Sequence, residues 1–221
     1  YSRDIRTVER REVFTLRDFT LRFDPAVLRF FLGIAAPFAL AGIFARVYSS
    51  IDSVILSKLA SNTEVGLYGV AYKIAFAFQF VPMAVAAAAY PAMSEYYISD
   101  RVRLRVVFEK AKLALLLIGA PLAAGTAILA RPLVVAVYGV DFAGAALPLT
   151  ILMGALLFAF LYWPAGSLLN ACDRQKKNTA AMGVTMATNI ALNFLLVPAY
   201  GRNGAAVAAL VGNALLCILA F

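Results

Sequence analysis

The sequence predicts an all-α protein, a polytopic transmembrane bundle of six helices, and three observations lead to that fold class. The chain is 63% hydrophobic and only 14% charged, whereas soluble domains are roughly half apolar and roughly a quarter charged. Its apolar residues are gathered into six long stretches. Its basic residues are concentrated in alternate gaps between these stretches, as in membrane proteins whose short cytoplasmic loops collect Lys and Arg.

Each apolar stretch is long enough, or nearly long enough, for a membrane span. A helical span needs about 20 apolar residues to cross the hydrocarbon core, and a helix is required because an isolated strand would leave backbone polar groups unpaired in lipid. The predicted spans are residues 30–57, 65–92, 111–130, 143–169, 179–197 and 204–221. Together they form one transmembrane six-helix lobe, residues 30–221. The apolar run 133–139 is too short to span, so we predict a helix end or an interfacial segment there.

Prolines and small residues indicate how these helices bend and pack. Gly204, Ala208 and Gly212 form a stripe in the last span that lets helices approach closely in lipid. Asn189 and Asn193 lie four residues apart on one helix face, and interhelical hydrogen bonding is the simplest role for them. Each of the first four spans has a proline in its interior, where it tends to kink the helix: Pro37, Pro82, Pro121 and Pro164.

The distribution of Lys and Arg predicts the orientation of the spans. The head, residues 1–29, carries seven Arg, and the gaps at 101–112 and 174–177 carry five and three cations. The other gaps hold one cation each, Lys58, Arg131 and Arg202. Fifteen of the twenty cations therefore lie on one face, which we predict to be cytoplasmic. We expect a multi-pass protein of the bacterial cytoplasmic (inner) membrane, whose head is a basic cytoplasmic linker or an interfacial amphipathic segment.

Composition excludes several kinds of site. The sequence has no His and only two cysteines, Cys172 and Cys217, so it offers no His-based catalytic centre, metal site or disulfide framework. The formal charge of +8 is divided among short loops, which argues against nucleic acid as a partner. We expect a protein that is not an enzyme and has no cofactor. Because the chain starts at Tyr1 rather than Met and stops inside an apolar run at Phe221, we also expect a fragment of a longer protein.

Arg46 is the first candidate for substrate binding. It lies near mid-depth of the first span, where a cation costs about 2.5–3.5 kcal/mol on insertion scales, so its side chain should face the bundle interior or a watery cavity. The guanidinium presents a fork that matches phosphate oxygens. The alternative is a buried ion pair or bonds to backbone carbonyls. Gln79 lies near the same depth in the second span and is a candidate hydrogen-bond partner for Arg46.

Lys73 and Asp52 lie at similar depths in two spans that a short loop joins. The two spans should be antiparallel neighbours, so a Lys73–Asp52 ion pair is geometrically plausible. In the alternative, Lys73 contacts the substrate and Asp52 takes part in proton or ion coupling. The sequence leaves both interpretations open.

A family resemblance runs through most of the chain from residue 30 onward. The segments that carry it include 51–56 (Ile-Asp-Ser-Val-Ile-Leu), 64–74 (Glu-Val-Gly-Leu-Tyr-Gly-Val-Ala-Tyr-Lys-Ile) and 197–206 (Val-Pro-Ala-Tyr-Gly-Arg-Asn-Gly-Ala-Ala). Segments 90–94, 169–176 and 189–193 add to it. In this order they resemble the polysaccharide and O-antigen flippases, which move lipid-linked oligosaccharides and belong to the multidrug, oligosaccharidyl-lipid and polysaccharide exporter superfamily.

The resemblance implies a protein with two six-helix lobes around a central cavity. This chain would be mainly the second lobe, with the N-terminal lobe of the same protein missing ahead of Tyr1. The implied function is translocation of an undecaprenyl-pyrophosphate-linked oligosaccharide from the inner to the outer leaflet by alternating access, for polysaccharide or O-antigen biosynthesis. Its partners would be the lipid-linked oligosaccharide, membrane lipids and the missing lobe. Arg46 and Lys73 are the positions nominated to hold the pyrophosphate.

Three alternative functions remain at this point. A flippase for the peptidoglycan precursor lipid II is not distinguished by the sequence. A multidrug or cation antiporter of the same superfamily would favour buried carboxylates and an aromatic cavity, whereas the apolar runs here contain two cations and one peripheral carboxylate, Asp52. A membrane-embedded glycosyltransferase or acyltransferase would need an acidic metal pair or a His-based centre, and the spans have neither.

Overall fold

The computed structural model describes residues 25–221, apart from the side chains of 26–28 and 30–34. Most of the predicted basic head, residues 1–24, lies outside the described residues. The chain forms two compact units, 1–36 and 37–221, and all side-chain contacts that follow are within the second. Its described part is helical with no strand, which confirms the all-α fold class.

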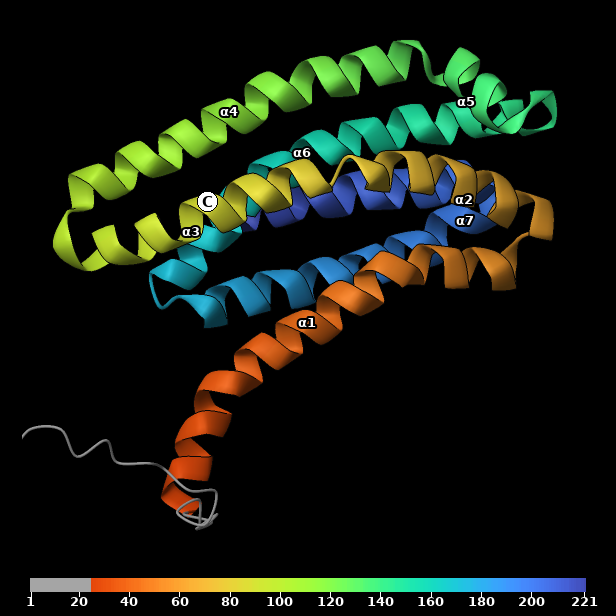
Figure 1. Ribbon diagram of the computed structural model, residues 1–221. Helices are drawn as coiled ribbons and strands as arrows, with labels where there is room; N and C mark the ends of the chain where they lie inside the picture. The colour runs from red at the N-terminus through yellow and green to blue at the C-terminus, as the bar shows by residue number, and fades with distance from the viewer. Residues whose placement is uncertain (1–24) are drawn as a thin grey trace, which may run out of the picture. The chain divides into compact units, whose positions relative to one another are not determined.

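The helices follow one another with short connections (Figure 1). In chain order they are α1 (Pro25–Leu59), α2 (Asn62–Ala77), α3 (Phe80–Ser99), α4 (Arg101–Ile128), α5 (Ala130–Tyr138), the 3-10 helix η2 (Val140–Ala145), α6 (Ala146–Ala171) and α7 (Gln175–Ala220). In the described range, five segments are long and apolar enough to cross a membrane: Ala35–Leu59, Asn62–Ser99, Arg101–Ile128, Val140–Ala171 and Gln175–Ala220.

The last segment folds back on itself and supplies two crossings. Gly201 interrupts α7 with φ 52° and ψ −132°, a backbone conformation that side chains other than glycine rarely adopt. Beyond it, Gly204 lies so close to the first arm that an added Cβ would be 2.5 Å from the carbonyl oxygen of Leu196. Figure 1 shows the two arms of α7, residues 175–200 and 202–220, running in opposite directions. With the two arms of α7 counted separately, the described helices therefore supply an apolar helical segment for each of the six predicted stretches.

The second crossing is interrupted where its proline removes a hydrogen bond. Pro82 has no N–H to donate to the carbonyl of Phe78, and a proline ring clashes with the carbonyl four residues before it. Helix α2 accordingly ends at Ala77, and the N–H of Gln79 bonds to the carbonyl of Phe76 at 3.0 Å before α3 begins. The prolines at 37, 121 and 164 lie inside α1, α4 and α6, which continue through them.

Side-chain caps mark where two of the helices begin. The Ser61 hydroxyl accepts the backbone N–H of Glu64 at 3.3 Å, as expected where a serine is followed three residues later by a glutamate. The Asp100 carboxylate accepts the N–H groups of Val102 and Arg103 at 2.9 and 3.0 Å. Each cap satisfies backbone donors that have no partner within the helix. These caps place the starts of α2 and α4.

Helix α6 is the centre of the lobe and packs against α2, α3, α4, α5 and α7. Its Phe160 is fully buried, and Gly119 of α4 lies against the ring so closely that an added Cβ would be 2.6 Å from Cδ1. Tyr68 of α2 and Met153 of α6 are buried in the same core. The close approach of α4 to α6 therefore depends on the missing side chain at Gly119.

The stripe of small residues in the second arm of α7 packs against two different elements. Gly204 approaches the first arm of α7, and an added Cβ at Gly212 would be 2.7 Å from the hydroxyl oxygen of Tyr48 on α1. That hydroxyl donates to the carbonyl of Ala209 at 3.3 Å and accepts from the amide of Asn213 at 3.0 Å. Small residues thus let α1 and both arms of α7 pack together, as expected for helices in lipid.

Candidate functional site

A buried carboxylate lies where α1, α2 and α7 meet. Asp52 is only 6% exposed. Its Oδ2 accepts the hydroxyl of Tyr68 at 2.9 Å, and its Oδ1 accepts the amide of Asn193 at 2.7 Å. Asn193 therefore makes the interhelical bond predicted for it. In the part of the chain that the structure describes, no Lys or Arg forms an ion pair with Asp52, so its charge is stabilised only by neutral donors.

Two further buried polar side chains lie on the same face of α7 as Asn193. Thr185, Asn189 and Asn193 are spaced four residues apart, and each is at most 1% exposed. Thr185 Oγ1, Asn189 Nδ2 and Asn193 Oδ1 have no hydrogen-bond partner. Buried polar atoms without partners are costly and mark places where a ligand or water would be stabilised. The face of α7 toward Asp52 therefore retains unused donors and acceptors.

A cavity of about 190 Å³ adjoins Asp52 inside the lobe. Its polar lining includes Asp52, Gln79, Thr185 and Asn213. Aromatic and apolar side chains make up most of the rest, including Phe44, Tyr48, Tyr72, Phe76, Leu156, Tyr162, Trp163 and Met182. The arrangement suits a small ligand that has both apolar surface and a group able to pair with a carboxylate.

The four predicted site residues separate into two pairs. Asp52 and Gln79 line the cavity, whereas Arg46 and Lys73 are exposed on the surface of the lobe and do not line it. Arg46 makes no hydrogen bond to Gln79, and Lys73 makes no ion pair with Asp52 among the described residues. Of the three charged candidates, only the carboxylate of Asp52 is therefore buried within the lobe.

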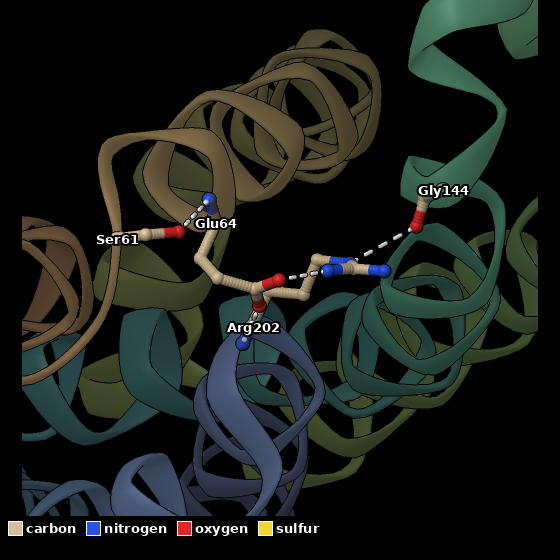
Figure 2. Close-up of polar contacts among 4 residues, drawn as sticks. All are labelled: Ser61, Glu64, Gly144 and Arg202. Atoms are coloured by element: carbon tan, nitrogen blue, oxygen red, sulfur yellow. Dashed lines mark hydrogen bonds and ion pairs between the residues drawn. The ribbon is translucent and has the colours of Figure 1, made fainter.

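A second polar cluster joins three segments at the start of α2 (Figure 2). Glu64 of α2 forms an ion pair with the guanidinium of Arg202, and its Oε2 accepts the backbone N–H of Arg202 at 2.8 Å. Arg202 Nε donates to the carbonyl of Gly144 in η2 at 3.1 Å. The pair is partly buried, with side chains 26% and 24% exposed. The cluster ties the bend of α7 to α2 and η2.

Sequence reasoning missed Tyr68 as a member of the buried network and missed Thr185 as a buried polar residue on the same face of α7 as the two asparagines. The spacing of Thr185, Asn189 and Asn193 was a usable signal, because three polar residues at intervals of four share one helix face. Nothing local pointed to Tyr68, which faces Asp52 only because α1 and α2 pack together. Tertiary packing therefore decided the composition of the network.

Two known relatives and one solved structure resemble this chain. Over 177 residues it is 28% identical to "Probable flippase AglR" of Haloferax volcanii, and the aligned region covers 78% of this chain and 37% of that protein. Over 173 residues it is 24% identical to "Probable low-salt glycan biosynthesis flippase Agl15" of the same organism, with the same two coverages. The chain thus spans a little over a third of the length of these curated relatives.

The solved structure is titled "Lipid II flippase MurJ, inward closed conformation". It superposes with a TM-score of 0.69 at 17% identity, over 93% of this chain and 45% of that one. At this identity the likeness shows the fold, and it supports the multi-pass membrane architecture seen in the helices. Residues 13–147, more than half of the chain, match the family described as "Polysaccharide biosynthesis protein". The chain therefore belongs to that family of polysaccharide biosynthesis proteins, in agreement with the flippase resemblance read from its sequence.

Proposed function

We propose that this lobe is part of a flippase that moves a lipid-linked oligosaccharide across the cytoplasmic membrane, without bond chemistry. Family membership and the two flippase relatives support the general activity. The finer part of the proposal is the predicted substrate, an oligosaccharide on undecaprenyl pyrophosphate that is used for polysaccharide or O-antigen synthesis in a bacterial inner membrane. The relatives are archaeal, so they support a flippase in general rather than this particular substrate.

The exposed position of Arg46 is the observation that carries this proposal. Its neighbours on the same surface, Ile43 and Val47, are apolar and exposed, as lipid-facing residues are. A guanidinium at this depth in lipid would cost about 2.5–3.5 kcal/mol. A water-filled cavity between this lobe and the rest of the protein removes that cost, and such a cavity is where an alternating-access carrier holds its substrate. The fork of Arg46 can then bind the phosphate oxygens.

Lys73, Gln79 and Asp52 have separate roles in the proposal. Lys73 is exposed on α2 and supplies a second positive charge for the pyrophosphate. Gln79 lies at the break between α2 and α3 and is only partly buried, so we assign it to hydrogen bonding with the glycan. Asp52 is buried without a cation and has unpaired polar neighbours, so we assign it to proton or ion coupling rather than to substrate contact.

The experiment replaces Arg46 in the full-length protein and measures export of the glycan together with the protein level in the membrane. Arg46→Ala should lower export at least about ten-fold at an unchanged protein level, since a charge-assisted bond to phosphate contributes roughly 1.5–3 kcal/mol. Lys58→Ala is the matched control, because Lys58 is an exposed cation in the last turn of the same helix and should export normally. Normal export by Arg46→Ala would refute the substrate role.

A cation or drug antiporter is a second candidate, and one observation favours it. The cavity inside the lobe combines a buried carboxylate with several aromatic rings, which is the combination expected of a site for organic cations. Efflux of a cationic dye by the full-length protein, lost in Asp52→Asn, would support the antiporter. Glycan export that depends on Arg46, with no dye efflux, would support the flippase.

A further inference from the structure

The strongest feature outside the proposed site is a basic groove at the end of the lobe where α3 meets α4 and α6 meets α7. In Figure 1 the two turns lie at the same end of the lobe. The groove has a volume of about 410 Å³. Its cations are Arg101, at the start of α4, and Arg174 and Lys177, at the start of α7. They belong to the two gaps that the charge pattern places on the cytoplasmic side.

The interior of the groove is apolar. Its floor contains Ala165, Leu169 and Ala220, each less than 9% exposed. Phe108 and Phe221 form part of the wall, with ring centroids 5.9 Å apart. Three cations thus surround a hollow whose base would hold hydrocarbon. A simple anion would use only the charges, whereas an amphiphile would use both parts.

The groove cations differ from other basic residues of the same face. Arg103 pairs with Asp100 at 3.2 Å, and Lys112 pairs with Glu109 at 2.6 Å. Among the described residues, the three groove cations form no ion pair, and no Asp or Glu lines the groove. A positive-inside bias alone requires only that Lys and Arg be present on this side. It does not require that three unpaired cations from two separate gaps line one apolar hollow.

We propose that this groove binds an anionic phospholipid of the adjacent leaflet, with the phosphate between Arg101, Arg174 and Lys177 and one acyl chain on the apolar floor. Basic pockets between membrane helices are suited to anionic headgroups. The guanidinium of Arg101 lies 3.9 Å from the ring centroid of Tyr97, and this contact limits the side-chain freedom that binding would otherwise remove. The site is separate from Arg46, Lys73 and the cavity beside Asp52 and does not depend on the substrate.

Adjacent lysines provide a matched test. Lys176 and Lys177 are both exposed in the first turn of α7, but only Lys177 lines the groove. The purified, delipidated full-length protein would be titrated with fluorescent phosphatidylglycerol. Lys177→Ala should weaken binding about five-fold, because one cation near an anionic headgroup contributes about 1 kcal/mol. Lys176→Ala should leave it unchanged. Arg101→Ala and Arg105→Ala form the corresponding pair on α4, since Arg105 is exposed and outside the groove.

Further arms of the same titration identify the ligand. Phosphatidylcholine should bind at least ten-fold more weakly than phosphatidylglycerol, and inorganic phosphate at equal concentration should not displace the lipid. Equal losses in Lys176→Ala and Lys177→Ala would overturn the proposal, because they would mean diffuse surface attraction. Displacement by inorganic phosphate would also overturn it in favour of a free-anion site. Tighter binding of undecaprenyl phosphate than of phosphatidylglycerol would assign the groove to the substrate instead.

Discussion

The bend of α7 makes a quantitative prediction about Gly201. Alanine there would have to adopt φ 52° and ψ −132°, and a non-glycine residue in such a region costs about 1–3 kcal/mol. Its Cβ would also lie 2.5 Å from Oε2 of Glu64. The carboxylate can move away only by losing the N–H of Arg202, which it accepts at 2.8 Å. That lost bond adds about 1–3 kcal/mol, so we expect Gly201→Ala to destabilise the fold by about 2–6 kcal/mol.

The assay is equilibrium unfolding of the full-length protein in mixed detergent micelles, followed by circular dichroism. Gly66→Ala is the control, because Gly66 is in α2 close to Glu64 and an added Cβ there meets nothing within 4 Å. It should stabilise the helix slightly, by about 0.5–1 kcal/mol. In a Glu64→Ala background the clash disappears, so Gly201→Ala should cost only the backbone part, about 1–3 kcal/mol. Equal unfolding free energies for Gly201→Ala and Gly66→Ala would refute the reasoning.

Two further substitutions test other close contacts by the same measurement. Arg202→Ala removes the partner of Glu64 and should lower the free energy of unfolding by about 1–3 kcal/mol. The control is Arg131→Ala, at an exposed cation with no ion pair in the described chain, which should change stability by no more than about 0.5 kcal/mol. An unchanged unfolding free energy in Arg202→Ala would contradict the assigned role of the cluster. Gly119→Ala places a Cβ 2.6 Å from a buried aromatic ring of α6 and should lower the free energy of unfolding by about 1–3 kcal/mol through overpacking. In the control, Gly125→Ala, the added Cβ meets open space, so stability should be unchanged or slightly higher. Similar results for the two glycines would show that α4 and α6 are not in tight contact.

Hydropathy located the helices well because each predicted span is a long apolar run. It did not predict the helix ends, since a helix can continue beyond the hydrocarbon. Helix α4 begins at Arg101 rather than at residue 111, because Asp100 caps it and its first turns lie among the charged residues of the basic face. The apolar run at 133–139 lies mostly in the short separate helix α5 rather than at the end of a longer one.

For the candidate site residues, the sequence predicted the depth of each residue along its span. It did not predict the side of the helix from which each side chain projects. Arg46 and Asp52 are six residues apart, which at about 100° per residue places them about 120° apart around α1. They cannot share a face, so only one of them can point into the lobe. In a soluble helix, apolar periodicity would identify the inward face. Here both faces are apolar because lipid covers the outer one, and only packing showed that Asp52 points inward.

Ion pairs at both ends of the lobe change the net charge that the pattern of Lys and Arg would suggest. Arg202 counts as a lone cation of its gap, yet its ion pair with Glu64 neutralises it, so the positive charge of that face is smaller than the number of its cations. On the opposite face, Arg103 and Lys112 are paired in the same way. The unpaired cations of the described loops there include the three that surround the basic groove. Counting Lys and Arg predicts orientation, but the charge left after pairing is what an anionic ligand would meet, and on that face three of the unpaired cations line an apolar hollow.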